Sequence, residues 1–172
     1  TADVIDEAAP VIDSITFVEP LCNGYSTGSA SVYTSGGTAP FTYQWDDPAA
    51  QTAQTALALQ DGLYAVQVSD ANGCTALQLV NVTEPSQLVA IADLDRIICY
   101  GDSTQVWASG QGGTPFPDGS YTVTWDNLPN TGSDPVTVAP LTTTQYCATV
   151  VDANGCLPVS SCVTITVTPP LA

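Results

Sequence analysis

The five-residue motif Asp-Ala-Asn-Gly-Cys occurs twice in this chain, at residues 70–74 and again at residues 152–156. Internal repeats are looked for first, because a repeat defines the module whose fold is then predicted. The two halves also match outside the motif, because each carries a Cys-x-Gly, a Gly-Gly-Thr, a Trp-Asp and then the motif, in that order. The sequence therefore contains two copies of one module.

The joint between the copies is predicted where Glu-Pro-Ser-Gln-Leu interrupts two β runs, at residues 84–88. We predict a linker from an upstream module over residues 1–10, a first module over 11–90 and a second over 91–172. No signal peptide opens the chain, so we expect it to be an excerpt from a longer exported protein.

Short Thr- and Val-rich runs separated by Gly and Pro predict an all-β chain. Their apolar residues alternate, as in strands with one buried face. In one such run Phe41, Tyr43 and Trp45 share a face, and we assign Trp45 and its counterpart Trp125 to the core. About seven strands in each copy and no helical stretch predict two tandem immunoglobulin-like β-sandwiches, stapled by disulfides.

The six cysteines are an even number, with no Cys-x-x-Cys and no His to complete a zinc site. Disulfides formed in an oxidising compartment are therefore expected. Asn-Gly in the motif predicts a tight hairpin turn, and the Cys that follows would begin the last strand. The first copy has only two cysteines, so a Cys22–Cys74 bond is predicted. The equivalent cysteines of the second copy should pair in the same way, as Cys99–Cys156, which leaves Cys147 to pair with Cys162.

The hairpin of the second copy provides an independent check on one of these bonds. A two-residue turn at Asn154-Gly155 would place Cys147 directly opposite Cys162. A three-residue Ala-Asn-Gly loop would instead place them on opposite faces of the sheet, unless a bulge restored the register.

The charge balance excludes several function classes. The chain has no Lys, no His, one Arg (Arg96) and 17 acidic residues, for a net charge of −16. Such a surface repels phosphate backbones and anionic headgroups, so nucleic-acid and membrane-surface partners are not expected. No apolar stretch is long enough to span a bilayer. Without His or Lys a serine has no ordinary general base, so we predict that the chain is not an enzyme.

Calcium is the one cofactor that the residues suggest. Carboxylates near predicted strand ends could gather with loop carbonyls around a hard cation. No Asp-x-Asp-x-Asp-Gly loop is present, however, and Asp at the first position of a turn has a sufficient structural reason. The candidate ligands are Asp46, Asp47, Asp61, Asp70, Asp126 and Asp152.

Loop aromatics suggest a glycan ligand as a further alternative. Tyr25, Tyr100 and Phe116 lie in predicted loops and are the candidates for an exposed contact. Tyr33 and Trp107 occupy equivalent strand positions and are expected to be half-buried.

The first copy resembles the SprB-type repeat of bacterial gliding adhesins over roughly residues 11–92. The resemblance rests on its cysteines, Gly-Gly-Thr-x-Pro, the tryptophan and the motif, all in order. The second copy carries an insertion, Pro-Phe-Pro-Asp-Gly-Ser, and two extra cysteines. It looks closer to the PKD/immunoglobulin-like modules found beside such repeats.

This resemblance implies a very long cell-surface protein, exported by a type IX secretion system, that serves in adhesion and surface motility. We therefore predict a non-catalytic, extracellular stalk or filament module whose partners are neighbouring modules of the same chain. Exposed strand edges would also permit several chains to bundle into a fibre. The alternatives are a calcium-dependent or carbohydrate-binding module and an accessory domain of a secreted glycosidase.

Three residues are candidates for glycosylation. Asn81 lies in an Asn-Val-Thr sequon. Ser14 and Ser103 follow an Asp, in a pattern that resembles the O-glycosylation signal of bacteria that carry such adhesins.

Overall fold

The computed structural model describes residues 9–128 and 135–170. The chain divides into two compact units, Thr1–Glu84 and Pro85–Ala172, which we call module 1 and module 2. The division falls within the Glu-Pro joint, a few residues before the predicted boundary at residue 90. All regular structure in the described residues is β-strand, and no helix there is long and apolar enough to cross a membrane.

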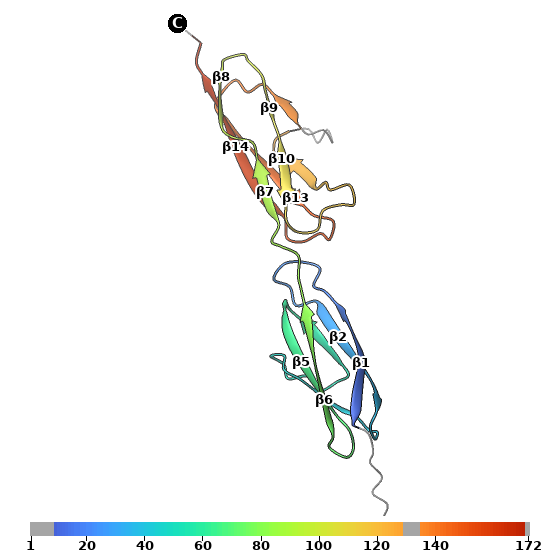
Figure 1. The fold of residues 1–172 in the computed structure, drawn as a ribbon. Coiled ribbons are helices and arrows are strands. Elements are labelled where there is room, and N and C mark those ends of the chain that lie inside the picture. The colour runs from blue at the N-terminus through green and yellow to red at the C-terminus, as the bar shows by residue number, and fades with distance from the viewer. Residues whose placement is uncertain (1–8, 129–134, 171–172) are drawn as a thin grey trace, which may run out of the picture. The chain divides into compact units, whose positions relative to one another are not determined.

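Module 1 is a sandwich of two three-stranded sheets (Figure 1), one with the order β1-β2-β4 and the other with the order β3-β5-β6. This division of strands is that of the immunoglobulin-like fold. The strands are β1 (Pro10–Val18), β2 (Gly28–Gly36), β3 (Thr42–Trp45), β4 (Thr55–Leu59), β5 (Gly62–Ser69) and β6 (Thr75–Val82).

Alternating side chains of the two sheets meet in the core of module 1. Trp45 is 1% exposed, and its indole Nε1 donates a hydrogen bond to the carbonyl of Ala53 at 2.9 Å. Phe41 and Tyr43 pack against the same core, which confirms the predicted shared face of this strand. The other buried members are Ala30, Val32, Ala56, Leu59, Tyr64, Val66, Val68, Val80 and Val82.

Module 2 has the same sandwich plan, with its first strand divided between the two layers. The first part pairs antiparallel with β10, and the second pairs parallel with the last strand. A four-stranded sheet of order β11-β13-β14-β8 faces the pairs β10-β7 and β12-β9. The strands are β7 (Val89–Ala92), β8 (Arg96–Cys99), β9 (Thr104–Val106), β10 (Ala108–Gln111), β11 (Thr122–Trp125), β12 (Val136–Val138), β13 (Thr144–Val151) and β14 (Val159–Thr168).

The core of module 2 is built from smaller side chains. Val106, Val163 and Ile165 are fully buried, and Trp125 packs against them from the edge while remaining partly exposed. Trp125 therefore contacts the core, as predicted, but it is less buried than its counterpart Trp45 in module 1.

The strand count differs from the predicted seven in each module, because the described residues form six strands in module 1 and eight in module 2. In module 1 the segment between β3 and β4 folds into a compact loop, closed by a hydrogen bond from Trp45 N to Gln51 O at 2.9 Å. In module 2 the extra strands arise because the first strand is divided into β7 and β8, and because β9 and β10 are separate segments on either side of Trp107.

Tyr33 is 47% exposed and Trp107 is 40% exposed, so each side chain is about half-buried, as predicted. Tyr33 follows the buried Val32, and Trp107 lies between the buried Val106 and Ala108. Strand alternation therefore turns both aromatic rings outward.

Candidate functional site

The repeated motif in module 1 is a turn closed by a buried carboxylate. Asp70 is 6% exposed and accepts hydrogen bonds from the backbone N–H groups of Thr38, Asn72 and Cys74 at 3.1, 3.0 and 2.8 Å. Burial raises the pKa of Asp70, but these N–H donors lower it by more, so the pKa lies below its usual value of 3.8. The carboxylate joins the β5–β6 turn to the Gly-Gly-Thr segment after β2.

The same arrangement is present in module 2. Asp152 is 2% exposed and accepts from the N–H groups of Thr114 and Cys156, both at 2.9 Å. The side-chain amide of Asn154 donates to Thr114 Oγ1 at 3.0 Å, as Asn72 does to Thr38 Oγ1 in module 1. We call this repeated arrangement the aspartate clasp.

The paired glycines of Gly-Gly-Thr are required by the clasp. Gly37 and Gly113 adopt φ angles of +62° and +57°, which side-chain-bearing residues rarely adopt. A Cβ at Gly113 would lie 2.7 Å from Asp152 Oδ2, and one at Gly37 would lie 3.1 Å from Asp70 Oδ2. Two widely separated motifs in the sequence are therefore the two halves of one contact.

The predicted two-residue turn at Asn-Gly is wrong in both modules. Gly73 and Gly155 have positive φ angles, whereas neither Asn does. In each case the Gly N–H donates to the carbonyl of the motif Asp, so Ala and Asn form the corners of an ordinary four-residue turn. The structure therefore has the three-residue loop that was considered as the alternative.

The six calcium candidates are spread over five turns, and only Asp46 and Asp47 share one. Asp47 accepts from the N–H groups of Ala49 and Gln51 and from the Gln51 side chain, and Asp46 accepts from Ala65 N at 2.7 Å. Asp70 and Asp152 close the clasps, while Asp61 and Asp126 are exposed. Within residues 9–128 and 135–170 no three His, Cys, Asp or Glu side chains gather to hold a metal. Calcium binding therefore stays a prediction.

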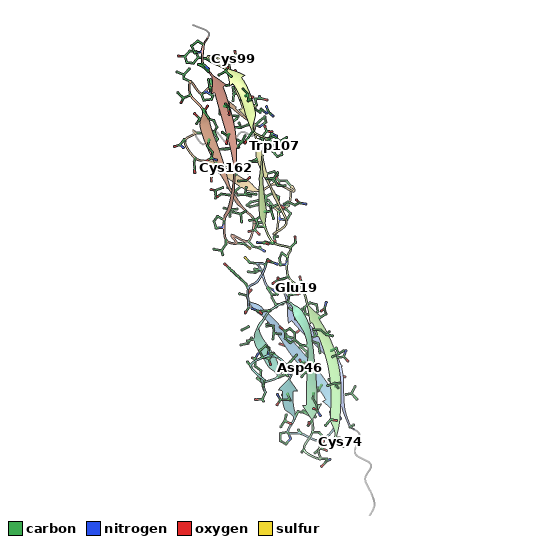
Figure 2. All side chains as sticks on the ribbon, turned by 90° about the vertical axis from the view of Figure 1, so that its left-hand side faces the viewer. Glu19, Asp46, Cys74, Cys99, Trp107 and Cys162 are labelled. Atoms are coloured by element: carbon green, nitrogen blue, oxygen red, sulfur yellow. A yellow bond between two sulfur atoms is a disulfide. The ribbon has the colours of Figure 1, made fainter. Side chains whose placement is uncertain are left out.

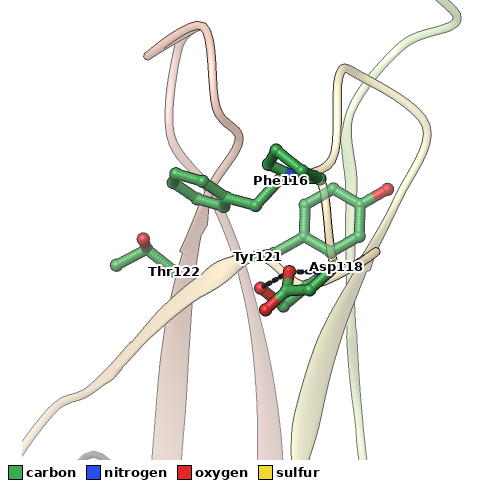
Figure 3. A pocket seen from close by; sticks show the side chains of 6 residues that line it. Phe116, Asp118, Tyr121 and Thr122 are labelled. Carbon is green, nitrogen blue, oxygen red and sulfur yellow. Dashed lines mark hydrogen bonds between the residues drawn. The ribbon is translucent and has the colours of Figure 1, made fainter.

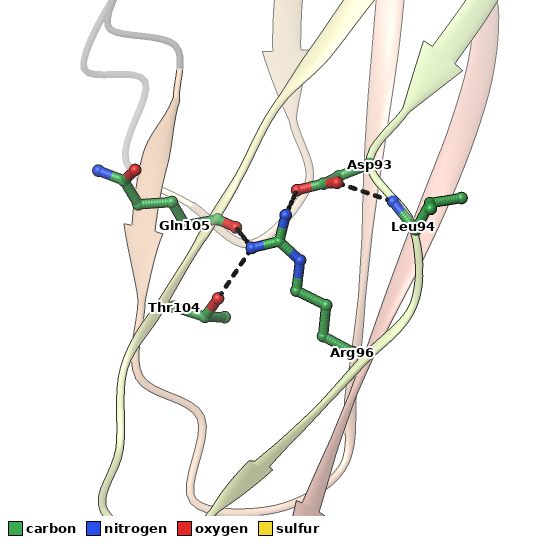
Figure 4. A network of polar contacts seen from close by, with 5 residues as sticks. All are labelled: Asp93, Leu94, Arg96, Thr104 and Gln105. Carbon is green, nitrogen blue, oxygen red and sulfur yellow. Dashed lines mark hydrogen bonds and ion pairs between the residues drawn. The ribbon is translucent and has the colours of Figure 1, made fainter.

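The single arginine stabilises the point where the first strand of module 2 changes sheets (Figure 4). Arg96 Nη2 lies 2.7 Å from Asp93 Oδ2, and Nη1 donates to Thr104 Oγ1 and to the carbonyl of Gln105. Asp93 Oδ1 also accepts from Leu94 N at 2.9 Å. The guanidinium thus ties the β7–β8 crossover to β9.

The insertion of module 2 forms a small surface hollow (Figure 3), with a volume of about 480 Å³. Asp118 Oδ1 accepts from Ser120 N at 2.9 Å, which closes the turn. The hydroxyl of Tyr121 donates to the Gly112 carbonyl at 2.8 Å, and Phe116 beside it is 37% exposed. The other loop aromatics, Tyr25 and Tyr100, are exposed but do not line this hollow.

The structure contains one of the three predicted disulfides in the predicted place. Cys147 on β13 is bonded to Cys162 on β14, and the two are directly opposed in the strand register. The register was expected to require either a two-residue turn or a bulge. The structure has the bulge, because Leu157 and Pro158 are unpaired residues between the turn and the start of β14.

The predicted pairs Cys22–Cys74 and Cys99–Cys156 are wrong, because Cys74 and Cys99 carry free thiols. Cys22 and Cys156 are each in a disulfide. The topology separates both predicted pairs, since the two cysteines of a pair lie at opposite ends of their module. Figure 2 shows Cys74 at one end of module 1 and Glu19, close in sequence to Cys22, at the other.

The three glycosylation candidates are all exposed. Ser14 lies on β1 beside a bulge that displaces Asp13 from the ladder, Ser103 lies between β8 and β9, and Asn81 lies on β6. Each could be reached by a modifying enzyme, and modification of each stays a prediction.

Comparison with known proteins identifies one segment. Residues 14–50 match the family model of the SprB repeat. The SprB match covers the second half of β1 and all of β2 and β3, and it ends within the loop around Asp47. No curated protein matches the chain.

Several solved structures of tandem immunoglobulin domains are similar to the chain. Titin domains I67–I69, in an E-to-A mutated variant, share 16% identity over 95% of this chain and 67% of that one, with a TM-score of 0.49. The N-terminal eight Ig domains of Down Syndrome Cell Adhesion Molecule share 15% identity over 94% and 25% of the two chains, with a TM-score of 0.47. DIP-gamma IG1+IG2 shares 12% identity over 93% and 98%, with a TM-score of 0.45.

Proposed function

We propose that this chain is a pair of non-catalytic structural modules of a long cell-surface adhesin or filament. The aspartate clasp, present in both modules, is the observation that carries the proposal. The clasps use the buried carboxylates of Asp70 and Asp152 to hold backbone N–H groups, so the most repeated chemistry of the chain stabilises the sandwich.

The charge and family observations support the same proposal. The similarity of residues 14–50 to the SprB repeat supports a repeat module, and a net charge of −16 suits an exposed extracellular surface. The chain's one arginine is engaged in an ion pair with Asp93. Export by a type IX secretion system, a role in gliding, and association of several chains into a fibre are part of this proposal.

A module-exchange experiment tests whether the modules act as a spacer. In the full-length protein on the cell surface, residues 9–170 are replaced by two unrelated immunoglobulin-like modules of similar length, and attachment of cells to a surface is measured. A spacer role predicts attachment close to that of the parent strain, whereas simple deletion of the segment lowers it. Loss of attachment in the exchanged strain, with normal surface display, would show instead that the modules bind a ligand.

A carbohydrate-binding role is a second candidate, favoured by the hollow in module 2. An aromatic ring, a hydroxyl and a carboxylate around a hollow are groups that orient a sugar. A glycan array with the two-module protein and with Phe116→Ala tests this role. Phe17→Ala is the control, since Phe17 is also an exposed phenylalanine but lies in module 1. Binding that is lost in Phe116→Ala alone would favour it. The calcium-dependent form of this role predicts binding heat with calcium in calorimetry.

A further inference from the structure

The last strand of module 1, β6, is an edge strand that is paired on one side. It pairs with β5 in unbroken antiparallel register over Thr75–Val82, and no other strand of the described residues pairs with it. Across the turn, Asp70 N donates to Cys74 O at 3.0 Å, so every second residue from Cys74 onward bonds β5. The residues between them turn their N–H and C=O groups away from β5. These outward residues are Thr75, Leu77, Leu79 and Asn81.

The outward residues also present apolar side chains beside the free edge. Their side chains lie on the outer face of the sheet, since they alternate with the buried Val80 and Val82, and Leu77 and Leu79 are 67% and 53% exposed. The outward carbonyl of Leu79 accepts from Nε2 of Gln78 in the same strand at 3.4 Å. The edge therefore offers backbone donors, backbone acceptors and leucines together.

The other three edge strands of module 1 carry features that hinder the addition of a further strand. β1 begins with Pro10 and is bulged at Asp13, β3 has four residues, and β4 has five residues with Ala58 at a positive φ of 56°. Short strands, bulges, proline and charged side chains are the means by which proteins protect sheet edges. β6 has eight residues, no proline, no charged side chain and no bulge.

The equivalent edge of module 2 is covered over its second half. β14 is the counterpart of β6, because each follows an aspartate clasp, and β8 pairs parallel with residues 165–168 of β14. The Asp95 carboxylate also accepts from Thr164 N at 2.7 Å. In module 1, β1 lies near β6 in the facing sheet but is paired with β2 over Pro10–Val18. This edge of the module therefore accepts a further strand, and the described part of module 1 does not supply one.

The charge of the chain favours a second copy of itself as the partner at this edge. Copies with a net charge of −16 repel one another, so they approach closely only where acidic side chains are absent. The face beside β6 meets this condition, because the β5 residues opposite its outward residues include Leu63, Ala65 and Gln67, which are uncharged. The strand itself offers no carboxylate that would select a basic partner.

We propose that β6 pairs antiparallel with β6 of a second copy of this chain, which joins two three-stranded sheets into one of six strands. A two-fold axis at Gln78 places Leu77 of each copy opposite Leu79 of the other, and Thr75 opposite Asn81. All four are outward residues, so their backbone groups meet in this register. The pairing gives a surface to the association of chains that is part of the proposed function.

A single pairing of this kind is weak. An eight-residue strand is about 27 Å long and about 5 Å wide, so it covers far less than the roughly 800 Å² per partner of a stable interface. We therefore expect dimers of the isolated chain at concentrations of about 0.1–1 mM. Repeated along an array of modules, the same contact gains strength because the later pairings are intramolecular.

Sedimentation equilibrium of the two-module chain tests for the dimer. The chain carries Cys74→Ser and Cys99→Ser, so that no disulfide between thiols joins two copies, and it comes from a host that adds no glycan to Asn81 at this edge. The average mass should rise toward that of two chains as the concentration approaches about 1 mM. Salt should strengthen the association, because it screens the repulsion between acidic copies. A chain that stays monomeric at about 1 mM in about 0.5 M salt would overturn the proposal.

Hydrogen exchange of single amides, measured by NMR, locates the contact. On association the amides of Leu77 and Leu79 should exchange several-fold more slowly, because they gain acceptors in the second copy. The amides of Ala76 and Gln78 already bond β5 and should keep their rates. Equal slowing of all four amides, or slowing of none, would show that the chains do not pair through this edge.

Three variants separate edge pairing from stacking of the two outer faces. Leu77→Pro removes an outward N–H and spares the bonds to β5, so module 1 should keep its circular dichroism spectrum. Leu79→Glu adds a charge at the edge without changing the backbone. Each should weaken association by at least about tenfold. Leu63→Glu is the matched control, because Leu63 is 62% exposed on the same face but lies on the central strand β5.

Edge pairing predicts that Leu63→Glu associates within about twofold of the parent chain. If it weakens association as much as Leu79→Glu, or if folded Leu77→Pro associates like the parent chain, the pairing is refuted. These measurements use the purified chain and do not depend on attachment of cells. Their result is therefore separate from that of the module exchange.

Discussion

Removal of the buried carboxylate in module 2 should destabilise that module strongly and leave module 1 unaffected. In Asp152→Ala, the N–H groups of Thr114 and Cys156 lose acceptors that each now lie at 2.9 Å. Asp152 is 2% exposed, so water replaces these contacts poorly. Each buried donor left without a partner costs about 1–3 kcal/mol, which predicts a loss of roughly 3–4 kcal/mol in the free energy of unfolding of module 2.

The measurement is urea unfolding of the oxidised two-module protein, with hydrogen exchange read by mass spectrometry on peptides from each module. With a urea dependence of about 1.5–2 kcal/mol per molar for a domain of this size, the midpoint of module 2 should fall by roughly 2 M. Asp102→Ala is the matched control, because it removes the same charge from an exposed position in the same module. The reasoning is refuted if both variants have the same midpoint, or if module 1 is destabilised equally.

The other predictions concern the cores, the acid limit and the single cation. Trp45→Phe should lower the unfolding free energy of module 1 by about 2–3 kcal/mol, because the Ala53 carbonyl loses its donor. Trp125→Phe should cost less, since its buried indole N–H has no hydrogen-bond partner among the described residues; urea midpoints of the two variants decide this. Burial raises the pKa of Asp47 and of Asp70, but hydrogen bonds lower each by more, to below 3.8. Both carboxylates therefore stabilise the fold at any pH above their unfolded-state pKa, and this stabilisation is lost as the pH falls through their lower folded-state pKa. The melting temperature of module 1 should fall as the pH falls below about 4. The same melting temperature at pH 5 and at pH 2 would contradict this. Arg96→Met should cost less than about 1 kcal/mol, because the ion pair is partly exposed, and a larger shift in the midpoint of module 2 would show that the crossover depends on it.

The repeat and the strands could be predicted because both are encoded locally. Alternation of apolar residues follows from the two-residue period of a strand, so the shared face of Phe41, Tyr43 and Trp45 needed no knowledge of the partner sheet. The Cys147–Cys162 bond was predictable for a similar reason. Hairpin register depends on the few residues of the connecting loop and the bulge beside it.

The aspartates show where local patterns become insufficient. Asp47 and Asp70 look like calcium ligands in a sequence, because Asp near a strand end serves equally well as a metal ligand or as a turn-closing acceptor. In the structure both carboxylates accept hydrogen bonds from backbone N–H groups, which is the turn-closing role. The Gly-Gly-Thr segment could have suggested this role, since two adjacent glycines signal a close approach of another group.

The sequence by itself determined that the chain is two copies of one all-β module, because repeated motifs and alternating polarity are properties of neighbouring residues. Only the tertiary structure decided which cysteines can meet. The order in which strands enter the two sheets places the Cys-x-Gly loop and the motif turn at opposite ends of each sandwich. That order depends on contacts between residues far apart in the chain, and no spacing of cysteines along the sequence records it.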